Sequence, residues 1–245
     1  MKTIDLNCDL GEFEHWIERD VRLCEFVSSI NVACGGHAGT PETMRRLCEA
    51  GHRLGIRVGA HPSYPDRAGF GRVPMPMEHD ALREEMTRQA GQLAAAANAA
   101  GVRITHVKPH GALYHDAMGD IDVAMLILDA ARGVFGDVMF VAMSGARSIH
   151  ALVAAGAQVT PEAFADRLYI DARHLVSRNE PGALLDADAA CKQARLLATS
   201  GEVRTRTGGD ANVLCGTICV HSDAATSEFT VVRVSEELRS IGVLL

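Results

Sequence analysis

Seven short apolar segments form the clearest pattern along the chain. Most of them carry Val, Ile, Phe and Cys in continuous runs, without a strict alternation of apolar and polar residues. Such runs are typical of parallel strands that are covered on both faces. The segments are TIDLNCD (3–9), SSINVAC (28–34), IRVGAH (56–61), ITHVKPH (104–110), VMFVAMSG (138–145), AQVTPEAF (157–164) and GTICVHSD (216–223).

Amphipathic helical patterns separate these segments. From 78 to 100, apolar residues recur three or four positions apart and form one stripe, and Gly101 follows, where a glycine ends a helix. A second helix is expected from 41 to 54, with Thr40 as its N-cap. Further helices are expected to end near Gly156 and Gly201.

Repeated strand–helix units form either an open, doubly wound sheet or a closed barrel. Seven units, with no shift of composition between the two halves of the chain, favour the barrel. We therefore predict an α/β fold, a seven-stranded β/α barrel that varies the TIM barrel, as a single domain over residues 1–245.

Composition and charge limit the kinds of partner that this chain is expected to bind and the compartment in which it is expected to lie. The chain has 245 residues and a formal net charge of −7, without a run of Lys and Arg. This charge argues against a nucleic acid or an anionic membrane as partner. No apolar stretch approaches the length of about 18 residues that spans a bilayer, and the N-terminus lacks the pattern of a signal peptide. Seven cysteines without a CxxC pair indicate reduced thiols and a cytoplasmic protein.

Ionisable residues gather where the expected strands end. In parallel β/α folds these ends meet at one face, where functional groups lie. Each residue alone also has a structural explanation; Asp223, for example, is suited to cap the following helix. Together, four strand ends with histidine favour one shared site with acid, base and cationic groups. The residues are Asn7, Asp9, Glu12, Cys34, His37, His61, Lys108, His110, Ser144, Glu162, Asp166, Arg167, His221 and Asp223.

The segment HVKPHGAL (106–113) contains three ionisable side chains within eight residues. Pro109 cannot donate to a strand ladder, so strand pairing is expected to stop there. Lys108 and His110 then point toward the cleft, whereas His106 is expected to be structural. Motifs that would indicate other chemistry are absent: there is no GxxxxGK[ST] loop, no GxGxxG after the first strand, no GxSxG and no HExxH.

Seven sequence blocks carry a resemblance to a known family. They are DLNCDLGE, NVACGGHAG, VGAHPSYPDRAGFGR, HVKPHGALY, EAFADRLY, LVSRNEPGALL and TICVHSD, in this order over about residues 3–240. In these blocks the chain resembles the LamB/YcsF family. The resemblance implies a seven-stranded β/α barrel related to glycoside hydrolases and polysaccharide deacetylases. The chain departs from the family's pattern at three places. Gly36 stands where a phenylalanine is usual, Ser222 stands where a glycine often follows the histidine, and the segment 13–26 is shortened.

The resemblance also implies an activity, which is the ATP-dependent hydrolysis of 5-oxo-L-proline (pyroglutamate) to L-glutamate. The implied partners are 5-oxoprolinase subunits B and C. ATP, with Mg²⁺ as its counter-ion, is expected to be bound partly or wholly by a partner subunit, since no nucleotide loop occurs in this chain. No tightly bound cofactor is expected, and a homo-oligomer is left open.

Ring opening needs a cation for the phosphate or oxyanion, a base for water and an acid for the ring nitrogen. We expect Lys108 to supply the cation, Asp9 or His61 the base, and His110 the acid. The residues expected to hold the substrate are Asn7, Glu12, His37, Arg178 and His221.

Two other functions stay open at this stage. One is a metal-dependent deacetylase or amidohydrolase, in which Asp9, His37 and His61 hold the ion; the absence of an HxxxH helix pair counts against it. The other is a non-catalytic subunit that binds a lactam or a carbohydrate. Metal analysis and activity with the partner subunits distinguish these alternatives.

Overall fold

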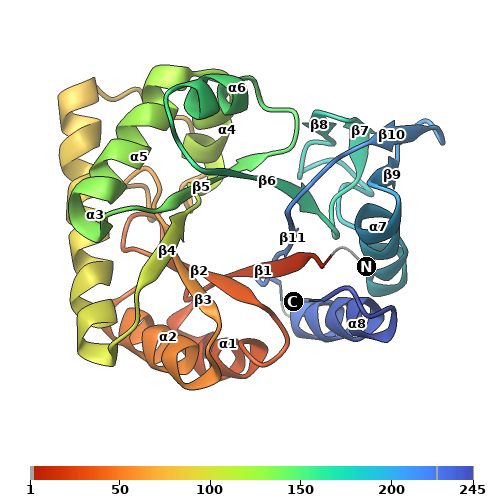
Figure 1. Ribbon diagram of the computed structural model, residues 1–245, viewed down its shortest axis with the longest axis horizontal. Coiled ribbons are helices and arrows are strands. Elements are labelled where there is room, and N and C mark those ends of the chain that lie inside the picture. The colour runs from red at the N-terminus through yellow and green to blue at the C-terminus, as the bar shows by residue number, and fades with distance from the viewer. Residues whose placement is uncertain (1–2, 225, 245) are drawn as a thin grey trace.

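Seven parallel strands close into a barrel in the computed structural model, which describes residues 3–224 and 226–244 (Figure 1). Around the barrel the order is β1-β2-β3-β4-β5-β6-β11, and β11 pairs with β1. Every expected strand is confirmed, and so is the barrel. The strands are β1 (Asp5–Leu10), β2 (Ser29–Ala33), β3 (Arg57–His61), β4 (Ile104–Val107), β5 (Met139–Met143), β6 (Val159–Phe164) and β11 (Thr217–Val220).

Helices surround the barrel on the outside (Figure 1). They are α1 (Ile17–Leu23), which follows the short 3-10 helix η1 (Glu14–Trp16), α2 (Pro41–Leu54), α3 (His79–Ala100), α4 (Gly111–Gly119), α5 (Ile121–Phe135), α6 (Arg147–Ala154), α7 (Ala187–Thr199) and α8 (Ser227–Ser240). None of the helices in the described part of the chain is long and apolar enough to cross a membrane.

Local sequence signals set the ends of α2 and α3 as expected. The side chain of Thr40 accepts a hydrogen bond from the Thr43 amide, which satisfies a free donor of the first turn of α2. Gly55 and Gly101 end the two helices in the left-handed conformation, both at φ 67°. The expectation for Asp223 is wrong, because the residue that precedes α8 as its N-cap is Thr226.

Two small hairpins were not predicted. β7 (Tyr169–Asp171) pairs with β8 (His174–Leu175), and β9 (Glu202–Arg204) pairs with β10 (Asp210–Asn212). Strands of two or three residues are too short to show the period of two from which a strand is recognised. The hairpins lie outside the barrel, on the side of α7 (Figure 1).

Apolar and polar residues alternate along β1 and divide the molecule into two layers. Leu6, Cys8 and Leu10 are fully buried members of the hydrophobic core. Asn7 and Asp9 instead join the polar network inside the barrel, where Nδ2 of Asn31 on β2 donates to both of them at 2.8 Å. The interior of the barrel is therefore a hydrogen-bonded polar column, and the apolar core lies between the strands and the helices.

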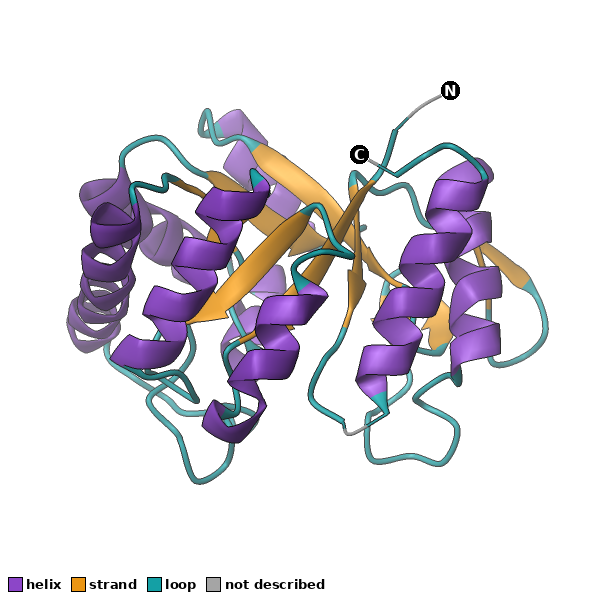
Figure 2. Cartoon of the chain, turned by 90° about the horizontal axis from the view of Figure 1, so that it is seen from below, coloured by secondary structure: helices purple, strands orange, loops and turns teal. Residues whose placement is uncertain are grey.

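The two ends of the described chain meet beside the barrel. The Ile4 amide donates to the Val243 carbonyl at 2.7 Å. Figure 2 shows both ends on one edge of the molecule, whereas long loops gather at the opposite edge.

Substitution of Gly59 tests how closely the polar interior of the barrel is packed. A methyl group on Gly59 of β3 would overlap the ring of His106, which Asn31 Oδ1 holds at 2.8 Å. We expect Gly59→Ala to lower the free energy of unfolding by about 1–3 kcal/mol, because the His106 ring must shift from the position in which Asn31 holds it. Gly91→Ala is the matched control: it lies in α3 with open space around it, and should raise stability by about 0.5–1 kcal/mol. Urea unfolding measures both, and equal effects would contradict the packing argument.

Candidate active site at the carboxyl end of the barrel

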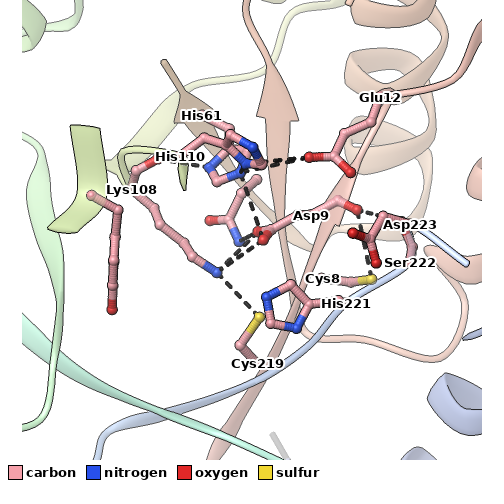
Figure 3. A network of polar contacts seen from close by, with 12 residues as sticks. Cys8, Asp9, Glu12, His61, Lys108, His110, Cys219, His221, Ser222 and Asp223 are labelled. Atoms are coloured by element: carbon pink, nitrogen blue, oxygen red, sulfur yellow. Dashed lines mark hydrogen bonds and ion pairs between the residues drawn. The ribbon is translucent and has the colours of Figure 1, made fainter. Parts of the chain in front are cut away.

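A buried lysine occupies the centre of the site (Figure 3). Lys108 follows β4, and its side chain is 3% exposed. Its ammonium group lies 3.0 Å from Asp9 Oδ1 and 2.8 Å from Glu162 Oε1. It also donates to Asn7 Oδ1 at 3.3 Å and to Cys219 Sγ at 3.1 Å. Four strands therefore contribute to the surroundings of one cation: β1, β4, β6 and β11.

Opposite charges keep this lysine protonated. Burial alone lowers the pKa of Lys108, but Asp9, Cys219 and Glu162 raise it well above its usual range. Burial would raise the pKa of Asp9, but His61 and Lys108 hold it below its usual range. Burial raises the pKa of Glu162, and Lys108 opposes that shift only in part. The two carboxyl groups thus share one cation unequally, with Asp9 as the more acidic partner.

Three histidines and Glu12 form a second cluster beside the lysine. His37 Nε2 lies 3.1 Å from Glu12 Oε1, and His110 Nδ1 lies 3.4 Å from the same oxygen. His61 Nε2 is 3.0 Å from His110 Nδ1 and 3.6 Å from Asp9 Oδ2. His61 therefore joins the two clusters. Figure 3 shows the Glu12 carboxylate and the rings of His61 and His110 facing one another.

The backbone determines which ring nitrogens carry a proton. His61 Nδ1 lies 2.7 Å from the Lys108 carbonyl, and His110 Nε2 lies 3.0 Å from the Phe70 carbonyl. A carbonyl oxygen only accepts, so both nitrogens must carry hydrogen; this assignment follows from the hydrogen-bond network. Burial lowers the pKa of both rings, that of His110 to about 3. Burial raises the pKa of Glu12 to about 7.

Ring stacking orders the cluster further. The rings of His37 and His110 are parallel, at an interplanar angle of 3° and a centroid separation of 3.7 Å. The ring of His61 is almost perpendicular to that of His110, at 86°. Phe70 contacts His37 and His110 edge-on and stacks on Phe13, with centroids 5.2 Å apart. Phe13 thus packs against Phe70, the ring that contacts the histidines.

Three ion pairs, two of them on Asp223, form the rim of the site. Arg178 Nη2 lies 2.5 Å from Asp223 Oδ2, and Arg72 pairs with the same carboxylate. His221 Nδ1 lies 3.0 Å from Asp166 Oδ1. Burial would lower the pKa of His221, but Asp166 raises it above its usual value.

The structure brings the predicted site residues together. Seven of them are buried in the two clusters: Asn7, Asp9, Glu12, His37, His61, Lys108 and His110. His221 lies beside Asp9, since its ring nitrogen, an Asp9 oxygen and Cys219 Sγ are within 4.8 Å of one another. Arg178 lies at the rim, on Asp223. His106 has a structural role, as expected, bonded to Asn31 and Thr105.

Three important neighbours of these residues received no role from the sequence. Glu162 was recognised as an acid of the strand expected at 157–164, but its contact with Lys108 was not predicted. The Tyr114 hydroxyl of α4 donates to Glu162 Oε2 at 3.0 Å, and no motif indicated this contact. Phe70 contributes a backbone carbonyl, which no pattern of side chains could reveal.

Among the residues that the structure describes, the possible metal ligands fall into two groups: Glu12, His37, His61 and His110 form one, and Asp9, Cys219 and His221 form the other. The trio expected from the sequence for a metal, Asp9 with His37 and His61, is divided between them. Asp9 belongs to the group around Lys108.

Three comparisons with known proteins agree. The model of the LamB/YcsF family matches residues 4–245. A protein of Nocardia farcinica, named as the A subunit of 5-oxoprolinase, is 41% identical over 99% of this chain and 98% of its own. A Streptomyces coelicolor protein of the same name is also 41% identical, over 98% and 97% of the two chains.

Two solved structures are similar to this chain. A lactam utilization protein from Thermus thermophilus superimposes with a TM-score of 0.90 at 33% identity, covering 100% of this chain and 99% of its own. A family 4 carbohydrate esterase from Streptomyces lividans reaches a TM-score of 0.54 at 13% identity, covering 98% and 90%. That second likeness shows the fold alone.

The pair of His221 and Asp166 makes stability depend on pH. Because the pKa of His221 is raised in the folded chain, its contribution is complete below the unfolded value of about 6.5 and is lost as pH rises through the folded value. We expect the wild-type chain to lose more unfolding free energy than His221→Gln between about pH 6 and pH 9. Urea titrations at both pH values measure the difference. His150→Gln, at an exposed position, should follow the wild type; a His221→Gln curve parallel to wild type would refute the assignment.

Proposed function

The chain belongs to the LamB/YcsF family, and from that premise we propose that it catalyses the ATP-dependent hydrolytic ring opening of 5-oxo-L-proline to L-glutamate together with two partner subunits. The observation that carries the proposal is the buried, charge-paired Lys108 beside the histidine cluster. The names of the relatives, which refer to 5-oxoprolinase and to lactam utilization, support the same substrate class.

The chemistry of a lactam fits a preorganised cation. The amide of a five-membered lactam is stabilised by resonance, and its hydrolysis develops negative charge on the carbonyl oxygen. Phosphorylation of that oxygen makes the carbon more electrophilic and adds further negative charge. An ammonium group already held in place stabilises both species without reorganisation, and we assign this task to Lys108.

Asp9 positions Lys108 in this proposal. Its Oδ1 accepts from Lys108 at 3.0 Å and from Asn31 at 2.8 Å, and its Oδ2 lies 3.3 Å from the same ammonium. Both oxygens are therefore engaged, which makes Asp9 a weaker candidate for the base than the sequence suggested. The candidate bases for an attacking water are then His61 and Glu12, with His110 as the candidate acid.

The substrate carboxylate needs a partner at the rim. Arg178 and Arg72 converge on Asp223, and guanidinium groups bind carboxylates with two parallel hydrogen bonds. We propose that Arg178 exchanges this contact for the carboxylate of 5-oxoproline. Asn7, His37 and His221 complete the substrate contacts.

ATP is assigned to the partner subunits, with Mg²⁺ as its counter-ion. The sequence contains no phosphate-binding loop.

Replacement of the central lysine tests the proposal. We expect Lys108→Ala to lower glutamate release from 5-oxoproline and ATP by about 10²–10³-fold, the usual cost of removing a stabiliser of an oxyanion. The assay includes both partner subunits, and circular dichroism establishes that the variant is folded. Lys192→Ala is the control, because Lys192 is exposed on α7. Near-normal turnover by folded Lys108→Ala would exclude the assigned role.

The place of ATP is tested separately. We expect the isolated chain to show no binding of Mg-ATP at micromolar concentrations in calorimetry, and to release glutamate only when the partner subunits are present. Micromolar binding of ATP by the isolated chain would move the nucleotide site into this chain.

A further inference from the structure

We propose that His61 Nε2, His110 Nδ1 and Glu12 Oε1 together bind one divalent transition-metal ion. This site does not depend on lactam hydrolysis as the reaction, since it is inferred from the hydrogen bonds, distances and ring planes of the cluster.

The first argument is a count of protons. His61 uses its Nδ1 hydrogen on the Lys108 carbonyl, and His110 uses its Nε2 hydrogen on the Phe70 carbonyl. In the neutral rings the two remaining nitrogens carry only lone pairs, yet they face each other at 3.0 Å. Two lone pairs at this distance repel each other unless a positive centre lies between or beside them. Either a third proton or a metal ion meets this requirement.

The surroundings favour the ion over the proton. A third proton on either ring would leave an imidazolium in the buried pair, where His61 is 1% exposed and His110 8%. Removing an imidazolium from water is costly, which opposes that cation. A proton on Glu12 Oε1 would lie near His110 Nδ1, at 3.4 Å, but would leave His61 Nε2, 4.0 Å away, without a hydrogen. A metal ion instead requires neutral imidazoles, the form that burial favours.

The second argument is the spacing of the three donor atoms. They lie 3.0 Å, 3.4 Å and 4.0 Å apart. Ligands about 2.0–2.2 Å from a four-coordinate ion lie roughly 3.3–3.5 Å from one another. Small side-chain movements therefore suffice to close the site around an ion. Two imidazoles and one carboxylate suit zinc and other first-row ions better than Mg²⁺ or Ca²⁺.

Ring planes exclude His37 from the ligand set. A metal ion lies close to the plane of each imidazole that binds it. The parallel planes of His37 and His110, stacked at a centroid separation of 3.7 Å, have no such point in common. His37 Nε2 instead lies 3.1 Å from Glu12 Oε1, where its N–H orients the carboxylate. His37 is therefore a positioning residue.

The third argument is the outer set of contacts. Metal-binding histidines usually donate their other ring N–H to a carboxylate or a backbone carbonyl, as both do here. Phe70, which supplies one of these carbonyls, has φ 55° and is the only non-glycine residue with positive φ in the described part of the chain. Backbone strain of this kind persists where the surroundings enforce it and is concentrated at functional sites.

A bound ion of this kind supplies Lewis acidity toward a carbonyl oxygen or a water molecule. The roles of the protein's own groups then change: His61 and His110 act as ligands in place of proton carriers. Glu12 is held by His37, and Lys108 remains the cation on the opposite side of Asp9.

Metal binding by the isolated chain, without partner subunits, tests the site. We measure Zn²⁺ by mass spectrometry after reconstitution and dialysis, and Co²⁺ by its visible absorption. We expect about one ion per wild-type chain and a higher melting temperature with Zn²⁺. Bound Co²⁺ should show the visible absorption bands of an ion with few ligands, such as a four-coordinate one. His150→Gln, an exposed histidine of α6, should behave as the wild type does.

Ligand variants separate the roles within the cluster. We expect His61→Gln and His110→Gln to lose Zn²⁺ and the Co²⁺ bands, and the near-isosteric Glu12→Gln to keep the fold and bind Zn²⁺ far more weakly. His37→Asn should retain the ion with an affinity lowered about 10–100-fold, as for other outer contacts. A wild-type chain that takes up no Zn²⁺, or a Glu12→Gln variant that binds it as tightly as wild type, would overturn the proposal. Neither result depends on glutamate release, so the failure of one proposal leaves the other standing.

Discussion

One ammonium group shared by two buried carboxyl groups is the constraint on which the rest of the site depends. Lys108 brings together Asp9 of β1 and Glu162 of β6, which are fully or almost fully buried. Taking such charges out of water costs several kcal/mol per ion unless each finds partners. The polar interior of the barrel supplies these partners, through Asn7, Asn31 and the Tyr114 hydroxyl. A hydrophobic barrel core could not have held the lysine in its charged form.

The histidine cluster depends on the same constraint. Asp9 lies between Lys108 and His61, and burial, which lowers the pKa of His61 and of His110, outweighs its charge and leaves the histidines neutral. Glu12 comes three residues later, after β1 has ended, and turns toward the rings of His37 and His110. One short segment of chain thus supplies a carboxylate to each cluster. The result is a strongly charged centre around Lys108, next to a group of uncharged histidine rings.

Much of this site was predictable because the strand ends of a parallel barrel converge. That single rule placed Asp9, His61, Lys108 and His110 close together, and the helix caps at Thr40 and Gly101 followed from local chemistry. The rule says which residues meet but gives no information on which atoms face each other. The stacking of His37 on His110, the Phe70 carbonyl and the hydroxyl from α4 arise from tertiary packing, which leaves no periodic signal in the sequence.

The loop after β3 shows how packing completes what the strands begin. The Gly71 carbonyl accepts from the Ala112 amide at 2.9 Å, and a methyl group on Gly111 would overlap it. A methyl group on Gly71 would in turn lie 2.8 Å from Cβ of His37. Two glycines therefore let this loop close directly on the start of α4, and Phe70, which precedes Gly71, keeps its positive φ of 55°. The loop fixes the orientation of the His110 ring, so the ring has the orientation needed at the site before a ligand binds.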